Sequence, residues 1–308
     1  MEEHFECDVL VIGGGGAGIS AALAAAMKGA RVLLISKEPA GYGNTRISAG
    51  LIAFPGLLAE DDTEQFFRDI VVGGEFLSNQ ELAYVLAQEA PRAALFLERE
   101  GLGLERTGSG TLSFQVAIKL GGHRIPRTLM NFSAGIGFGQ VIKGSLVKSG
   151  IRTLSDALVT KLFTVNDRMV GAIGLNIATG EVFTVAAGET ILATGGGGWL
   201  YYPHTDVNRT TTGDGYTLAF EAGADLIDME QVQFIPFALT HPKSMVGIVC
   251  GEPFTVGPKG KILNQEGKEL ITGAAIKTRA EVARAIILEV EGGKGTAYGG
   301  SEVGFAGK

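Results

Sequence analysis

Cysteine is scarce in this chain of 308 residues: only Cys7 and Cys250 occur, and there is no C-x-x-C motif. Two isolated thiols cannot build a disulfide framework, nor can they hold an iron–sulfur cluster, which usually takes four thiolates. Histidine is also rare, with four residues and none of the spacings typical of metal ligands. We therefore expect no metal site, and we take a cytoplasmic location as the default.

A surplus of basic residues is missing too. The 33 Asp and Glu residues outnumber the 26 Lys and Arg, and the formal net charge of -7 argues against nucleic-acid binding. The start, MEEH, lacks the basic residues and apolar run of a secretory signal. Residues 9–27 carry no charge, but four successive glycines and a change from strand to helix period indicate a buried strand and helix. We therefore expect no transmembrane segment.

Glycine, in contrast, is abundant, with 47 residues, and its first cluster forms the clearest motif of the chain. Residues 8–12 predict a buried strand, residues 19–28 an Ala-rich helix and residues 31–36 a second strand. Between the first strand and the helix, residues 13–18 match G-x-G-x-x-G. This order of strand, glycine turn, helix and strand predicts a dinucleotide-binding βαβ unit.

Each glycine of the motif has its own task. Gly13 permits the tight turn, Gly15 lets a pyrophosphate approach the backbone, and Gly18 lets the helix pack closely on the strand. The N–H groups that open the helix then bind phosphate oxygens. The alternative is a glycine-rich loop without a ligand. The second strand ends in Ser36 and Lys37 instead of the acidic residue that binds the ribose of NAD, which weakens the case for an NAD-linked dehydrogenase.

A polar, glycine-rich loop follows at residues 38–56. Its small and hydroxyl side chains suit contact with a flat ring and a phosphate, although an ordinary surface loop is an equal alternative. Residues 62–100 are predicted to be helical, with Asn79 as an N-cap and Pro91 starting or kinking the next segment. We interpret these helices as scaffold.

The middle of the chain predicts a helix at residues 134–150 and then a series of short strands. These strands are expected near residues 151–163, 169–177 and 181–186, with turns at residues 166–167 and 179–180. Short strands after a βαβ unit suggest a meander laid on the main sheet. Residues 189–198, ETILATGGGG, predict a further strand and glycine turn that return to the nucleotide side of the sheet.

Three charged features could serve a ligand. The loop at residues 121–128, GGHRIPRT, could face an anion or could be a solvated basic loop. Asp214, before a helix ending at Gly223, could bond a ribityl or ribose hydroxyl or could cap the helix. The T-x-x-E capping box of residues 278–281 predicts a second helix, which begins at Arg279 and ends near residue 292. The dipole disfavours a cation in that first turn, so Arg279 suggests an anion site, with a solvated arginine as the alternative.

Together these segments resemble the flavoprotein subunit of the succinate dehydrogenase and fumarate reductase family. The resemblance covers almost the whole chain and rests on DVLVIGGGGAG, LLISK, ILATGG, TTTGDG, AGADLIDMEQVQF and TRAEVARAI. It implies an α/β fold: a Rossmann-like FAD-binding domain with a parallel central sheet and a β-meander, plus part of an α+β capping domain. The expected domains are residues 1–234, lacking the C-terminal return segment of FAD binding, and residues 235–308.

The resemblance implies FAD as the cofactor. The cofactor-binding positions that it implies are Gly13, Gly15, Gly16, Ala17, Gly18, Ser36, Lys37, Asn44, Thr45, Ser48, Ala49, Gly50, Val159, Ala193, Thr194, Gly195 and Asp214. In the respiratory enzymes of the family a histidine is bonded covalently to the flavin. The matching position here is Asn44, which has no nucleophilic ring nitrogen, so we expect non-covalent FAD.

For catalysis the resemblance implies a hydride passed between flavin N5 and a small organic anion, with electrons passed to an iron–sulfur subunit. Arg279 matches the family's proton donor, and Glu252 is a weaker match to its glutamate. Ile235 and Phe237 replace a His and a Thr that hold a dicarboxylate in the family, which puts that substrate in doubt. The segment FIPF resembles the flavoprotein of adenylylsulfate reductase instead, whereas the segment TTTGDG does not resemble that protein.

Two further expectations concern the whole chain. Family members continue well beyond this length, so the chain resembles a fragment or one half of a split flavoprotein. An alternative is therefore a non-catalytic flavin-binding or electron-relay protein, or a folded fragment that binds nothing. By resemblance, the expected location is the cytoplasm, with at most a peripheral position on the inner face of the membrane.

Overall fold

The computed structural model describes residues 3–104, 110, 122–131, 133–236, 238–239, 243–248, 261–264, 266–272 and 277–293. Its centre is a six-stranded sheet with the order β5-β2-β1-β8-β7-β6. The strands are β1 (Glu3–Ile12), β2 (Val32–Ile35), β5 (Arg152–Leu154), β6 (Ala157–Val165), β7 (Arg168–Asn176) and β8 (Val182–Leu192). Strands β5, β2, β1 and β8 are parallel, whereas β6, β7 and β8 form an antiparallel meander. The parallel sheet and the meander are thus confirmed.

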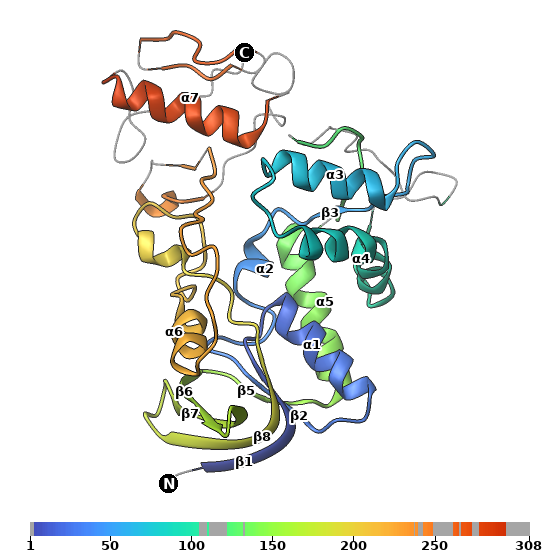
Figure 1. Ribbon diagram of the computed structural model, residues 1–308, viewed down its shortest axis with the longest axis vertical. Helices are drawn as coiled ribbons and strands as arrows, with labels where there is room; N and C mark the ends of the chain where they lie inside the picture. Colours follow the sequence, from blue (N-terminus) through green and yellow to red (C-terminus); the bar gives the residue numbers. More distant parts are fainter. Residues whose placement is uncertain are drawn as a thin grey trace.

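Helices cover both faces of this sheet. On one face lie α1 (Gly16–Met27) and α5 (Ala134–Ser149), and on the other lies α6 (Asp214–Glu221) (Figure 1). Strand β1 contributes core residues to both faces of the sheet. Val11 packs with α1 and α5, whereas Leu10 and Ile12 pack with Leu218 of α6. Residues 10–12, at the end of β1, and the whole of β2 are apolar and buried, because a parallel sheet is covered on both faces.

The remaining elements lie beyond the carboxyl ends of the parallel strands. They are α2 (Asn44–Ile47), α3 (Thr63–Gly73), α4 (Gln80–Arg99), α7 (Arg279–Glu291), the short 3-10 helices η1 (Gly198–Tyr201) and η2 (Lys243–Met245), and the two-stranded sheet of β3 (Leu51–Ala53) and β4 (Thr128–Met130). Figure 1 shows α3 and α7 at the end of the molecule farthest from the N-terminus. In the part of the chain that is described, no helix is both long and apolar enough to cross a membrane.

The predicted βαβ unit is confirmed, with small differences in its bounds. Strand β1 begins five residues before the predicted start, and α1 begins at Gly16 rather than at Ile19. Asn79 is the N-cap of α4, where its side chain accepts hydrogen bonds from the backbone N–H groups of Glu81 and Leu82. Local patterns were sufficient to locate these features.

Pro91 does not start a new segment, because α4 continues through it. Proline removes one hydrogen bond of the helix and crowds the preceding turn. Ala87 and Ala94, on either side of Pro91, are nevertheless both fully buried. Their packing against the rest of the molecule holds the helix together across the proline.

The strand boundaries differ from the predictions at two places. The single strand expected at residues 151–163 is divided into β5 and β6, with Asp156 at a positive φ of 53° between them. The sheet curls, so that the backbone N–H of Ala157 donates to the carbonyl of Ser36 (3.0 Å) although β5 and β6 are opposite edges. Conversely, the strand expected near residues 181–186 and the strand expected at the start of residues 189–198 are one continuous strand, β8.

Candidate functional site

In the glycine turn between β1 and α1, a side chain at Gly13 or Gly18 would overlap the backbone. Gly13 has a φ of 120°, and a Cβ there would overlap the carbonyl group of Ala193 at the end of β8. A Cβ at Gly18 would overlap the carbonyl oxygen of Gly13. The N–H of Gly13 donates to the carbonyl of Ile35 (2.8 Å), which ties the turn to the end of β2. The ends of three parallel strands therefore meet at this turn, as in nucleotide-binding sheets.

The start of α1 has the properties of an anion site. Its N-cap, Gly15, provides no side-chain hydrogen bond, and no acidic residue lies in the first turn. The N–H of Gly16 donates to the Thr45 hydroxyl oxygen (3.0 Å), and among the described side chains none accepts from the N–H groups of Ala17 and Gly18. Backbone N–H groups and the positive end of the helix dipole favour a phosphate at such a position. The pyrophosphate of a dinucleotide therefore fits this turn.

The polar loop of residues 44–50 is placed beside the turn, and its polar side chains fix its shape. Besides the contact of Thr45 with α1, the Asn44 side-chain oxygen accepts from the backbone N–H of Asn208 (2.8 Å). Ser48 donates to the Thr45 carbonyl (2.9 Å), and Asn131 donates to the carbonyl of Gly50 (2.8 Å). These bonds fix the shape of the loop beside the glycine turn.

Lys37 and Asp214, predicted separately, form an ion pair with each other. The Lys37 ammonium also donates to the Thr212 hydroxyl (2.8 Å), which in turn donates to the other carboxylate oxygen of Asp214 (2.9 Å). The alternative that Asp214 caps α6 is wrong, because Gly213 is the N-cap and Asp214 is the first helical residue. The pair is half-buried, so it can neutralise its own charges and still accept a hydrogen bond from a sugar hydroxyl.

Of the other cofactor positions, some lie near the glycine turn or the end of β8, whereas Val159 lies in the core. Ser36 is buried, and a Cβ at Gly14 would lie only 2.6 Å from its hydroxyl oxygen, so Ser36 borders the turn. Ala193 and Thr194 follow β8, and the start of α6 packs tightly on Thr194. The side chain of Val159, by contrast, is buried in the core of the sheet, so this residue could contact a nucleotide only through its backbone.

Arg279 is the first residue of α7, as predicted. The Thr278 side chain accepts from the backbone N–H of Glu281, and the Glu281 carboxylate accepts from the backbone N–H of Thr278 (2.8 Å), which completes the capping box. Arg284, further along the helix, lies 3.8 Å from Glu75, so α7 contacts the segment that follows α3. Glu252 and Phe237 lie outside the described residues.

The loop before β4 contains a buried ion cluster that the sequence did not predict. Arg127 is completely buried and pairs with Asp61 and with Asp69, each at 2.7 Å. Arg124 pairs with the other oxygen of Asp69 (2.7 Å). Both interpretations of residues 121–128 are therefore wrong for Arg127, which faces neither solvent nor a ligand. One signal was available: Asp69 follows Phe66 by three residues, on the buried face of α3.

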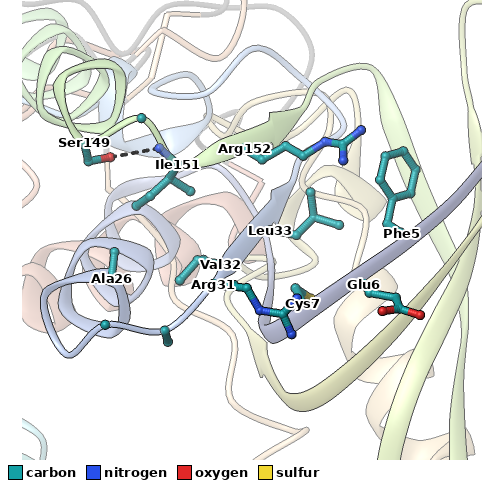
Figure 2. Close-up of a pocket in the computed structure, with 13 residues that line it drawn as sticks. Phe5, Glu6, Cys7, Ala26, Arg31, Val32, Leu33, Ser149, Ile151 and Arg152 are labelled. Atoms are coloured by element: carbon teal, nitrogen blue, oxygen red, sulfur yellow. Dashed lines mark hydrogen bonds between the residues drawn. The ribbon is translucent and has the colours of Figure 1, made fainter.

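A cavity of about 450 Å³ lies away from the glycine turn, between the first residues of β1, β2 and β5 and the last residues of α1 and α5. Figure 2 shows its lining, with the guanidinium of Arg152 over the ring of Phe5 at 4.5 Å from its centroid. Arg31, at its edge, is paired with Asp8 (2.7 Å). Ligands of open α/β sheets bind at the carboxyl ends of the strands, so this cavity is at the wrong end for the nucleotide. Among the described residues, no cluster of His, Cys, Asp or Glu could hold a metal ion.

Comparison with known proteins gives the family. The FAD binding domain family matches residues 8–300. One component of the fumarate reductase (CoM/CoB) of Methanothermobacter marburgensis is 35% identical over 97% of this chain and 55% of its own length. The mitochondrial succinate dehydrogenase [ubiquinone] flavoprotein subunit of Oryza sativa is 29% identical over 94% of this chain and 47% of its own length.

Solved structures agree. The quinol fumarate reductase FrdA of E. coli superimposes with a TM-score of 0.84 and 25% identity over 96% of this chain and 53% of its own. The adenylylsulfate reductase of Archaeoglobus fulgidus, at a TM-score of 0.74 and 22% identity over 95% of this chain and 49% of its own, shares the fold alone. The chain spans about half the length of these proteins. Because the family match extends over almost the whole chain, the protein belongs to the FAD binding domain family, with fumarate reductase and succinate dehydrogenase flavoproteins as its relatives.

Proposed function

We propose that this chain is the FAD-binding part of a flavoprotein oxidoreductase that interconverts a small organic acid and its unsaturated counterpart, as fumarate reductase does. The observation that carries the proposal is the start of α1, where close-packed glycines leave the backbone N–H groups of Ala17 and Gly18 for a pyrophosphate. When bound, FAD supplies hydride transfer at its N5 atom. The family match identifies FAD as the dinucleotide.

Different residues of the chain would bind the cofactor and the substrate. The first turn of α1 would hold the pyrophosphate, and the Lys37–Asp214 pair would bond a hydroxyl of the cofactor. The loop that contains Asn44 would lie against the flavin, which is bound without a covalent link. Arg279 would bind the organic anion and deliver the proton to it, because it opens α7, which lies beside the end of α3 through the Arg284–Glu75 pair.

An electron-transfer partner follows from what the chain lacks. Its two cysteines cannot hold an iron–sulfur cluster, whereas its relatives are named as subunits of fumarate reductases and succinate dehydrogenases. We therefore assign the onward transfer of electrons to a separate iron–sulfur subunit.

Replacing Arg279 by Lys tests the catalytic assignment. Lysine keeps the charge but not the planar fork of donors, so we expect the rate at which fumarate reoxidises the dithionite-reduced flavin to fall by about 100-fold or more, with flavin content unchanged. Arg284→Lys is the matched control, because Arg284 lies on the same helix and is exposed. Equal rates in the wild type and in Arg279→Lys would refute the role of Arg279.

The second candidate is a flavin-binding electron-relay protein without substrate chemistry. Ile235 favours it, because its side chain offers no hydrogen bond to a carboxylate where the sequence resemblance places a histidine. Both candidates predict a yellow protein that dithionite bleaches, and Asn44 predicts that acid precipitation releases all of the flavin. Only the oxidoreductase predicts that fumarate restores the yellow colour under anaerobic conditions.

A further inference from the structure

The buried ion cluster includes a histidine, His123, which lies against Arg127 and against Phe66 of α3. The Arg127 guanidinium donates through Nε and Nη2 to Asp61 (2.9 and 2.7 Å) and through Nη1 to Asp69 (2.7 Å). The same Nη1 lies 3.3 Å from Nδ1 of His123. The position of His123 is therefore set by a guanidinium that two buried carboxylates hold in place.

This contact decides the tautomer of the imidazole. A guanidinium has donors only, so the Nδ1 atom facing it must be the acceptor. The remaining proton of the neutral ring then sits on Nε2, which becomes a donor. Phe66 supports the arrangement, since its ring centroid lies 5.7 Å from that of His123 and 5.1 Å from the guanidinium carbon of Arg127. His123 is thus held as a fixed donor.

The surroundings also keep the imidazole neutral. Burial and the adjacent charge of Arg127 lower the pKa of His123 below its usual range, Asp69 and Asp61 oppose that shift, and the charge of Arg279 reinforces it. Asp61 and Asp69 are already balanced by Arg124 and Arg127. A proton on His123 would therefore add an unbalanced charge to the cluster. His123 contacts Phe66 of α3. Helix α7 lies beside the end of α3, where Arg284 is 3.8 Å from Glu75.

We propose that His123 is a specificity-determining residue of the substrate site, where its Nε2–H donates to a carboxylate oxygen of the organic anion that Arg279 binds. Arg127 is then a positioning residue that acts only through His123. The proposal rests on the proposed function, because the anion at Arg279 is its substrate. Arg279 supplies the charge that attracts the anion, and His123 adds a directed hydrogen bond that orients one carboxylate relative to the flavin.

Long-range ¹H–¹⁵N correlation spectra of the FAD-loaded chain test the tautomer and the contact together. His123→Gln identifies the His123 signals among those of the four histidines. At pH 7 we expect a neutral ring with the proton on Nε2, and a shift of Nε2 when malonate, an unreactive dicarboxylate, is added. A proton on Nδ1 or a fully protonated ring at pH 7 would overturn the proposal.

The flavin spectrum separates this proposal from the proposed function. If malonate perturbs the flavin absorbance and leaves His123 unshifted, the substrate site stands and the role of His123 is refuted. If malonate perturbs neither, the site at Arg279 is refuted together with the contact. A shift at His123 that Arg279→Lys abolishes supports both.

Binding measurements on matched variants show how much the hydrogen bond of His123 contributes to malonate affinity. Glutamine places an amide N–H close to the position of Nε2, whereas leucine has no donor. We therefore expect the dissociation constant for malonate to rise about tenfold or more in His123→Leu and about threefold or less in His123→Gln. His4→Gln, at an exposed histidine of β1, is the control and should leave the dissociation constant for malonate unchanged. Equal effects of Leu and Gln would contradict a hydrogen bond, and FAD content checks that each variant is folded.

Discussion

At Gly18 the absence of a side chain decides whether helix α1 can approach strand β1. A Cβ at this position would overlap the carbonyl oxygen of Gly13, so Gly18→Ala must push the start of the helix away from the turn. We expect a loss of about 1–3 kcal/mol in the free energy of unfolding, as for other overpacked sites. FAD affinity should fall about tenfold or more, because the N–H groups that bind phosphate move with the helix. Thermal unfolding and titration of the apoprotein with FAD measure the two effects.

Gly144→Ala is the control for that change. Gly144 lies within α5, and a Cβ there would meet nothing within 4 Å. Alanine in a helix interior is favoured over glycine by about 0.5–1 kcal/mol, so this variant should be slightly more stable and should bind FAD normally. A Gly18→Ala protein that matches Gly144→Ala in both measurements would contradict the close approach described for the turn.

Single residues were predicted well when their partners are near in sequence and poorly when they are not. Asn79 and Thr278 cap helices through N–H groups two or three residues away, so a short pattern is enough to find them. Arg127, however, pairs with Asp61 across 66 positions, and Lys37 pairs with Asp214 across 177. Such pairs depend on the complete fold, and no local pattern contains them.

Helix α7 begins with a complete capping box. Its described apolar contacts are few: Val282 and Ile286 pack with Ile262 in a small cluster. Removing the cap by Thr278→Ala should therefore destabilise the helix by about 1 kcal/mol. The backbone N–H of Glu281 donates to the Thr278 hydroxyl oxygen, so its hydrogen exchange should be faster in this variant. Thr278→Ser keeps the oxygen and should exchange like the wild type; acceleration in both variants would show that the cap bond is not the cause.

The elements themselves were predicted to the extent that their signals are periodic. The first strand, helix and second strand follow one another with clear changes of period, and all three are confirmed. The limits of β5, β6 and β8 were missed because they depend on the curl of the sheet, which turns the chain from one edge to the other at Asp156. Curl results from the twist of all the strands together, and a single segment does not reveal it.

For the whole molecule, the hydrophobic clusters indicate how the chain divides. The described clusters around the main sheet and α4 involve residues 5–222, whereas the cluster of α7 involves residues 262–290. Between them, residues 222–236 form no helix or strand and are mostly exposed. Among the described residues, the ion pair of Arg284 with Glu75 joins the two sides, and both side chains are largely exposed. Exposed pairs contribute little, about 0–1 kcal/mol, so this pair alone adds little to the stability of either side.

This division predicts that a chain ending at residue 234 folds and binds FAD. The glycine turn, the Asn44 loop and the Lys37–Asp214 pair all lie before that position, so FAD affinity should stay within about threefold of that of the full chain. The truncated chain also lacks Arg279, so malonate should no longer perturb its flavin absorbance. Fluorescence titration with FAD and difference spectra with malonate measure these two properties on the same samples. A truncated chain that cannot bind FAD would show that residues beyond 234 belong to the FAD-binding domain, whereas one that still responds to malonate would place the anion away from α7.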